Sequence, residues 1–287
     1  MQVVRDVGSL RAAIADARGR GERIGFVPTM GALHDGHLSL IDRVRQQCDC
    51  VVLSIFVNPL QFAPTEDLTT YPRTEAADLA AAAARGATLA FVPTVDVMYP
   101  SQRVVSVVPG LTGDQWEGAI RPGHFAGVLT VVAKLFNLVQ PDVAVFGQKD
   151  LQQATLLRAM VRDLNFSVTL DIAPIVREAD GLAMSSRNRY LDPEHRLTAR
   201  ALSQSLAALC GQFLTGVRDA ATLCATGDAR LRAESGVRVD YLSIVDPERL
   251  VPVETASAGD FAIVAARVGP TRLLDNHRLG DPFPSPS

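Results

Sequence analysis

The strongest constraint in this sequence is an alternation of short apolar runs with segments of helical period. The strand-length runs are ERIGFVP (22–28), VVLSIFV (51–57), TLAFVP (88–93), DVAVFG (142–147) and SVTLDIAPIV (167–176). Helical segments lie between them at 37–48, at 75–85 before Gly86, at 125–140 before Pro141, and at 149–164. This alternation is typical of parallel βα units. We therefore predict an α/β fold with a Rossmann-like parallel sheet and helices on both faces.

The pattern changes after residue 176. Two helices near 193–214 and 218–234, with strands at 237–245 and 261–268, predict a smaller α+β domain. We place the first domain at 1–176 and the smaller C-terminal domain at 177–280, and we expect 281–287 to be a disordered tail. The run VVSVVPG (104–110) is predicted to form an edge strand.

Composition excludes several classes of protein. The net charge of −3 argues against sequence-independent binding to nucleic acid, which requires a surplus of positive charge. The amino terminus has charges throughout and does not read as a signal peptide, and Lys134 interrupts a long apolar stretch, so we expect no membrane span. Four cysteines without C-x-x-C spacing predict reduced thiols in a cytoplasmic protein, with metal binding by Cys48 and Cys50 as an open alternative.

The stretch GFVPTMGALHDGHLSLI (25–41) places His34 and His37 where a helix begins. A glycine turn between strand and helix puts free backbone N–H groups and the positive end of the helix dipole at the carboxyl edge of the sheet. Two imidazoles there suit a phosphate that gains charge in a transition state, and Gly36 lets a nucleotide approach closely. Zinc ligation, ordinary surface or capping histidines, and glycines that serve turn geometry alone stay open as alternatives.

Two further segments are suited to phosphate binding. FGQKDLQQ (146–153) repeats the order of strand, glycine and helix start, with Lys149 as a charge for phosphate oxygens and Asp150 as an acceptor for a ribose hydroxyl. GLAMSSRNRYL (181–191) is a loop of small residues with adjacent hydroxyls and Arg187, which can fold over a triphosphate. A surface lysine and an interdomain linker are the plainer interpretations, but three such segments together favour a nucleotide site.

Four segments in order resemble one family. PTMGALHDGH, SIFVNPLQF, FGQKDLQQ and GLAMSSRNRYL are similar to segments of the pantothenate synthetase (pantoate–β-alanine ligase) family, nucleotidyltransferases with an H-x-G-H signature that are related in fold to class I aminoacyl-tRNA synthetases. The resemblance runs from about residue 20 to 190, with a weaker similarity at TRLLDN (271–276). Asp35 and Gln148 stand where Glu is more common in the family, at positions that supply no group the chemistry requires.

The resemblance implies an ATP-dependent ligation of (R)-pantoate and β-alanine to pantothenate. ATP and pantoate give pantoyl adenylate and pyrophosphate, and the amine of β-alanine then displaces AMP. It also implies a homodimer whose partners are these small substrates. Because Mg²⁺ often needs few protein ligands and the sequence offers no dedicated set of carboxylates, we expect this ion to be carried by the nucleotide, with no metal site of the protein's own. Another H-x-G-H nucleotidyltransferase, acting on a phosphorylated cofactor precursor, and a non-catalytic nucleotide-binding module remain the rival hypotheses.

The resemblance also assigns residues. Catalysis falls to His37, the family's proposed proton donor, with His34, Lys149 and Arg187. Pantoate binding falls to Gln61 and Gln153, and β-alanine binding to Gln61. The ATP site comprises Met30, Gly31, Ala32, Leu33, His34, Asp35, Gly36, His37, Gly147, Gln148, Lys149, Asp150, Val176, Met184, Ser185, Ser186 and Arg187.

Elementary chemistry gives a reason for the glutamines. The carboxylate of pantoate must attack the α-phosphorus, and an arginine paired with it would weaken it as a nucleophile, whereas neutral amides orient it without that effect. Surface or capping polarity is the plainer interpretation of Gln61 and Gln153. Because an acyl adenylate hydrolyses when water reaches it, we expect the 177–190 loop and the C-terminal domain to act as a lid.

Overall fold

A computed structural model describes residues 1–64, 66, 68–101 and 104–284. The chain divides into two compact units, and each is made of two stretches of sequence. The first unit comprises Met1–Gly147 and Gln152–Ala173, and the second comprises Gln148–Leu151 and Pro174–Ser287. The short segment Gln148–Leu151 therefore belongs with the C-terminal part of the chain, although a strand of the first unit leads directly into it.

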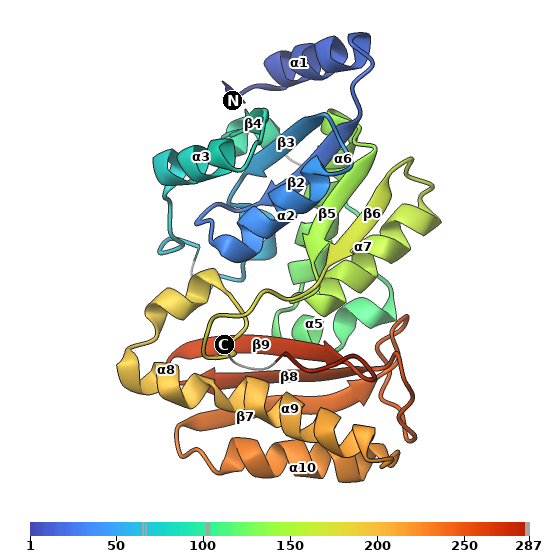
Figure 1. The fold of residues 1–287 in the computed structure, drawn as a ribbon. Helices are drawn as coiled ribbons and strands as arrows, with labels where there is room; N and C mark the ends of the chain where they lie inside the picture. The colour runs from blue at the N-terminus through green and yellow to red at the C-terminus, as the bar shows by residue number, and fades with distance from the viewer. Residues whose placement is uncertain (65, 67, 102–103, 285–287) are drawn as a thin grey trace. The chain divides into compact units, whose positions relative to one another are not determined.

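The first unit is built on a six-stranded sheet in which every strand pair is parallel (Figure 1). The strand order is β1-β4-β3-β2-β5-β6. The strands are β1 (Gln2–Val4), β2 (Ile24–Thr29), β3 (Cys50–Ile55), β4 (Leu89–Phe91), β5 (Val143–Gly147) and β6 (Thr169–Ala173). Every residue of β3 is buried, as expected for a strand covered on both faces.

Helices cover both faces of this sheet. One face packs against α1 (Val7–Gly19), α6 (His124–Val139) and α7 (Leu151–Asp163), through a core that includes Phe26 and Phe136. The other face packs against α2 (Asp35–Arg45) and α3 (Glu75–Ala84), through a second core that includes Ile41 and Leu53. Short helices α4 (Val95–Met98), α5 (Glu117–Ile120), η1 (Pro59–Gln61) and η2 (Leu111–Asp114) complete the unit. The predicted α/β fold is confirmed.

The order of the strands creates a switch point between β2 and β5. The chain adds β3 and β4 on one side of β2, and then crosses over to add β5 and β6 on the other side. Gly25 pairs with Val143 and Phe26 pairs with Ala144, so the carboxyl ends of β2 and β5 lie at the same edge of the sheet. Such a switch point is where open α/β sheets bind ligands.

The second unit contains an antiparallel sheet in the order β7-β8-β9. Its strands are β7 (Val237–Val245), β8 (Phe261–Val268) and β9 (Thr271–Arg278), and its helices are α8 (Pro193–Ala199), α9 (Ala201–Leu214), α10 (Ala220–Arg232) and η3 (Ser186–Tyr190). Figure 1 shows α9 and α10 lying along the strands, and their core includes Leu206, Leu223 and Val264. The predicted α+β character of this part is confirmed.

Some local predictions were wrong or incomplete. Residues 104–110 form no strand: Val104, Val105 and Val108 are exposed, and the backbone of Val107 bonds to the side chain of Thr130 instead of to another strand. The helix predicted at 193–214 is interrupted at Arg200. Neither α1 nor β9 was predicted.

Phe283 lies in the segment that we expect to be a tail. Its ring packs on the ring of His277 at 4.7 Å and lies under the guanidinium of Arg177 at 5.0 Å. Residues 285–287 of the predicted tail lie outside the described residues. In the part of the chain that is described, no helix combines the length and apolar character needed to cross a membrane.

Candidate active site

The H-x-G-H turn connects β2 to α2 through two left-handed residues. Gly31 has φ +83° and Ala32 has φ +52°, and His34 is the N-cap of α2. The imidazole rings of His34 and His37 lie with their centres 4.0 Å apart and their planes 36° apart. Both rings therefore gather at the amino-terminal end of α2, where the helix dipole favours negative charge.

The backbone N–H groups of this turn are partly occupied by a carboxylate. Asp78, on α3, is 3% exposed, and it accepts hydrogen bonds from the N–H groups of Ala32 (2.9 Å) and Leu33 (2.8 Å). Thr74 donates a third hydrogen bond to it, at 3.1 Å. The expectation that these N–H groups are free was therefore wrong for Ala32 and Leu33. The first turn of α2 still begins with N–H groups, those of Asp35 and Gly36, that have no helical carbonyl to bond.

Gln61 is buried beside this turn with its amide orientation determined by a neighbour. Asn58 accepts from Tyr99 Oη (2.9 Å) and donates its Nδ2 to Gln61 Oε1 (3.1 Å). Gln61 Nε2 consequently points the other way and lies 3.0 Å from the sulfur of Met30. Two residues that the resemblance assigns to substrates, Met30 and Gln61, are thus brought into contact.

A charged network that the sequence did not indicate surrounds the carbonyl of Gln61. Arg121 donates to both carboxylate oxygens of Glu66 (2.7 and 2.6 Å) and to the Gln61 carbonyl (3.3 Å). His124 Nδ1 lies 2.7 Å from the same carbonyl. Burial raises the pKa of Glu66, but hydrogen bonding and the charge of Arg121 outweigh burial and hold this pKa below its ordinary value. Arg121 is therefore paired with a carboxylate of the protein.

Two adjacent glutamines at the start of α7 have different environments. Gln152 is buried and makes three hydrogen bonds to the 112–117 segment, to Thr112 O (2.7 Å), Gln115 O (2.9 Å) and Glu117 N (3.0 Å). Gln153, assigned to pantoate, is half-buried. Among the described residues, no hydrogen bond joins Gln153 to Gln61.

A cavity of about 240 Å³ lies at the carboxyl ends of β2, β3 and β4. Met30, Gly31, Phe56, Arg73 and Asp78 are among the residues that line it. It is smaller than typical ligand pockets, which start at about 300 Å³. Of the residues predicted for ATP, it includes Met30 and Gly31.

In the second unit, Lys149 precedes α7 on a short segment. Its Nζ lies 3.7 Å from Asp150 Oδ1, and its side chain is 21% exposed. Gln148 donates to Asn276 Oδ1 at 3.1 Å, and Asn276 Nδ2 donates to the carbonyl oxygens of Gln148 and Lys149, both at 3.0 Å. The backbone at Lys149 is therefore bound to β9.

The predicted SSR loop is a hydrogen-bonded hairpin followed by η3. Met184 N donates to Val176 O at 3.0 Å, which joins two residues assigned to ATP. Ser185 is the N-cap of η3, and its hydroxyl accepts from the N–H of Arg187 at 3.3 Å. Arg196 donates to Asp180 (2.8 Å) and Glu178 (2.6 Å), which ties the hairpin to α8.

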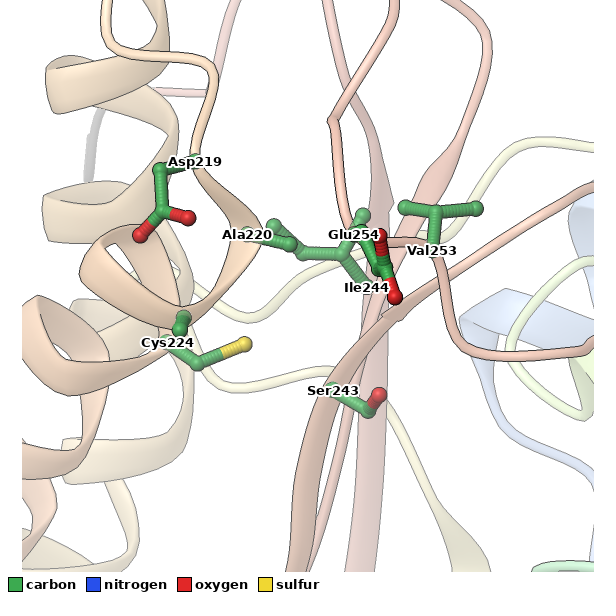
Figure 2. A pocket seen from close by; sticks show the side chains of 8 residues that line it. Asp219, Ala220, Cys224, Ser243, Ile244, Val253 and Glu254 are labelled. Carbon is green, nitrogen blue, oxygen red and sulfur yellow. The ribbon is translucent and has the colours of Figure 1, made fainter.

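A larger cavity in the second unit includes no predicted residue. Figure 2 shows the residues that line it, between the start of α10 and β7. Its volume is about 440 Å³. Asp219 and Cys224 of α10, Ser243 and Ile244 of β7, and Glu254 are among its lining residues. Burial raises the pKa of Cys224, which keeps its thiol protonated.

The predicted metal alternatives find no support in side-chain clustering. All four cysteines are free thiols. In the described ranges of the chain, no three His, Cys, Asp or Glu side chains come together in a group that could hold a metal ion.

The comparisons with known proteins agree along the chain. The family model of pantoate–β-alanine ligase matches residues 2–278. The chain belongs to this family. A pantothenate synthetase of Acidobacterium capsulatum is 50% identical to it, over 98% of both chains.

Solved structures of this ligase family have the same fold. Pantothenate synthetase from Thermus thermophilus superposes with a TM-score of 0.93 at 48% identity, over 97% of this chain and 99% of its own. Pantoate–β-alanine ligase from Francisella tularensis, complexed with β-γ ATP and β-alanine, superposes with a TM-score of 0.79 at 29% identity over the whole of both chains.

The predicted site residues are distributed over both units. The first unit contains Met30 to His37, Gln61, Gly147 and Gln153, and the second contains Gln148 to Asp150, Val176 and Met184 to Arg187. Two buried side chains that hold these segments by their backbone, here called anchors, were not predicted: Asp78, which binds residues 32 and 33, and Asn276, which binds residues 148 and 149. The only signal for Asn276 was the weak similarity at TRLLDN, and Asp78 had none.

Proposed function

We propose that this chain joins (R)-pantoate to β-alanine with ATP, through pantoyl adenylate, and forms pantothenate, AMP and pyrophosphate. In the first step a carboxylate oxygen of pantoate attacks the α-phosphorus and pyrophosphate leaves. In the second step the amine of β-alanine attacks the acyl carbon, loses a proton and displaces AMP. Family membership over residues 2–278 and relatives named as pantothenate synthetases support this function.

The observation that carries the proposal is the histidine pair at the switch point. His34 and His37 have ring centres 4.0 Å apart at the amino-terminal end of α2. The turn follows β2, which is paired with β5 at the position where ligands bind in such sheets. In our proposal both imidazoles donate to the phosphates, where negative charge builds as pyrophosphate leaves.

The orientation of Gln61 supports its proposed role in binding pantoate. Because Asn58 donates to Gln61 Oε1, the donor Nε2 remains for the substrate, and its present neighbour is the weakly accepting sulfur of Met30. An amide N–H orients a carboxylate or hydroxyl without neutralising it. Arg121, which stands nearby, is paired with Glu66 and so adds less positive charge to the pantoate carboxylate than an unpaired arginine would.

We assign the remaining substrate-binding residues as the resemblance does. Lys149, Ser185, Ser186 and Arg187 of the second unit would bind phosphate oxygens, and Gln153 would complete the pantoate site. Mg²⁺ would arrive with the nucleotide, because this ion prefers phosphate oxygens and keeps much of its water. In the second step the C-terminal unit would act as a lid that protects the adenylate from hydrolysis.

We further infer a cytoplasmic homodimer. The free thiols are compatible with a reducing compartment, and the dimer rests on the resemblance to the family. Sedimentation equilibrium tests the dimer, and a single species with the mass of one chain would contradict it.

Pantoate-dependent exchange of labelled pyrophosphate into ATP, without β-alanine, tests the proposed function. This ligase must show it, because the first step is reversible and needs no amine. A nucleotidyltransferase that acts on a phosphorylated precursor, or a non-catalytic nucleotide-binding module, would not. Absence of exchange in a folded protein that binds ATP would contradict the proposal.

His37→Ala tests the role of the donor in that assay. We expect exchange to fall by about 10²- to 10³-fold, as for loss of one donor to a developing charge. Ala has the higher helix propensity, so stability should change little at this position in α2. If the variant loses only affinity for ATP and keeps its maximal rate, His37 is not a transition-state donor.

A further inference from the structure

Two consecutive residues of β9 bind two different segments of the second unit, and both segments contain residues predicted to bind ATP. Asp275 and Asn276 are 3% and 2% exposed. Neighbouring residues in a strand point to opposite faces, so one dipeptide can hold two segments at once. The two segments are Gln148–Lys149 and the hairpin that leads to Ser185–Arg187.

Asn276 holds the first segment by its backbone. Its Nδ2 donates to the carbonyl oxygens of Gln148 and Lys149, both at 3.0 Å, and its Oδ1 accepts from Gln148 Nε2 at 3.1 Å. Both N–H bonds of the amide are thereby used on peptide groups that flank Lys149. The contacts determine where the main chain of Lys149 lies, and hence the region its Nζ can reach.

Asp275 holds the second segment through Arg177. The two form a paired contact at 2.6 and 2.9 Å, with side chains 1% and 7% exposed. Arg177 also donates to Gly181 O at 3.1 Å and forms a β-bridge with Ala183. The ion pair therefore fixes the base of the hairpin.

We propose that Asp275 and Asn276 are positioning residues of the ligase reaction, which act through Lys149 and through the Ser185–Arg187 loop. This inference rests on the proposed function. A phosphate-binding lysine must be placed to within a fraction of an ångström, and a misplacement of about 1 Å can cost about 10²-fold in rate. Neither residue need touch a substrate for its loss to lower the rate.

The test compares Asn276→Asp in two backgrounds. The substitution keeps the shape of the side chain, removes both N–H donors and places carboxylate oxygens against two carbonyl oxygens. In the otherwise unchanged chain we expect pantoate-dependent exchange to fall by about 10²-fold, with the KM for pantoate unchanged. In a Lys149→Gln background the same substitution should cost less than about threefold, because the group it positions is already absent.

Asn137→Asp is the matched control, because Asn137 is exposed on α6 and the charge change is identical. We expect it to leave exchange unchanged in both backgrounds. An equal loss from Asn276→Asp in both backgrounds would overturn the inference, since a general structural defect lowers both alike. A loss no greater than that of Asn137→Asp would overturn it too.

A second measurement does not depend on activity. Amide hydrogen exchange of the peptide spanning 147–154 should become faster in Asn276→Asp and in the uncharged Asn276→Ala, which remains available if the aspartate variant does not fold. Unchanged exchange in that peptide would overturn the inference. If the unmodified chain shows no pantoate-dependent pyrophosphate exchange, the proposed function fails instead, and the amide exchange still decides whether Asn276 holds Lys149.

Discussion

The segment 30–34, which follows β2, and the segment 148–150, which follows β5, are each held by one buried side chain, but the two side chains bind opposite backbone groups. Asp78 accepts from the N–H groups of Ala32 and Leu33. Asn276 donates to the carbonyl oxygens of Gln148 and Lys149. The first anchor has a negative charge and the second has none.

The difference decides which groups remain for a ligand. The successive N–H groups of Ala32 and Leu33 in this turn point toward one place, and turns with converging N–H groups bind anions. Here the carboxylate of Asp78 fills that point. A phosphate at this turn must therefore be met by the imidazoles of His34 and His37 and by the first turn of α2. The Asn276 anchor, in contrast, uses no backbone N–H group.

The comparison also explains why the anchors are not interchangeable. A carboxylate suits the first turn because it is acceptor-only and finds three donors there. An amide suits the second segment because peptide carbonyls require a donor. A carboxylate at Asn276 would face two carbonyl oxygens, and an amide at Asp78 would turn an N–H₂ group toward a peptide N–H.

Among the substitutions that test this comparison, Asp78→Asn is expected to have the largest effect on stability and on pyrophosphate exchange. One of the two buried peptide N–H groups would lose its acceptor, and the other would keep a weaker, neutral one. We expect the free energy of unfolding to fall by about 3 kcal/mol and pyrophosphate exchange by about 10²-fold or more, since the turn moves. Denaturant titration and the exchange assay measure the two effects. Asp96→Asn, at an exposed first-turn position of α4, is the control and should change neither.

If Asp78→Asn retains both stability and exchange, the turn is held by β2 and α2 alone. The carboxylate of Asp78 would then contribute nothing to the stability of the segment 30–34.

Gly31→Ala is expected to have an intermediate effect. At φ +83° a Cβ would lie 3.0 Å from Ile55 Cγ2 and 3.1 Å from Asp78 Oδ2. Left-handed backbone costs an L-residue about 1–2 kcal/mol, and displacement of the carboxylate should lower pyrophosphate exchange by about tenfold. Gly19→Ala, where a Cβ meets nothing within 4 Å, should leave both quantities unchanged or raise stability slightly. Equal melting temperatures for the two variants would contradict the strain argument.

Much of the fold could be predicted because burial leaves a strong pattern in sequence. The strand β3 is an unbroken apolar run because both of its faces are covered. The segment 104–110 has the same β-branched composition, yet it pairs with no strand in the described part of the chain, and Val104, Val105 and Val108 remain exposed. The interruption at Arg200 has no glycine or proline to mark it. Composition reports what a residue favours, whereas pairing depends on what the rest of the chain supplies.

The position of His34 and His37 at the start of a helix could be predicted from a motif, but the distant side chains that hold such turns could not. His34 and His37 are adjacent to the turn that positions them, so a short stretch of sequence contains the whole signal. Asp78 bonds to residues 45 and 46 positions away, and Asn276 to residues 127 and 128 positions away. A single aspartate in an alanine-rich helix has many equivalent interpretations until the fold gives it partners.

The smallest expected effect concerns charge in the second unit, where Asn276 does not titrate but the hairpin contains a group that does. Hydrogen bonding from Arg196 lowers the pKa of Asp180, against a smaller opposing effect of burial. A carboxyl whose pKa is lower in the folded chain stabilises it fully above the unfolded pKa of about 3.9. That stability is lost as the pH falls through the folded pKa.

Asp180→Asn should therefore lower the protection of the 177–183 hairpin against amide hydrogen exchange at pH 7, by about 1 kcal/mol, since the pair is only partly buried. The difference between the variant and the unmodified chain should stay constant down to about pH 5 and shrink below about pH 4, where the carboxyl is protonated first in the opened hairpin and then, at lower pH, in the folded one. Asp180→Asn should leave amide exchange in the segment 148–150 unchanged, because Asn276 and not Asp180 holds that segment. A difference that persists unchanged at pH 3 would mean that Asp180 stabilises the hairpin by its shape and not by its charge.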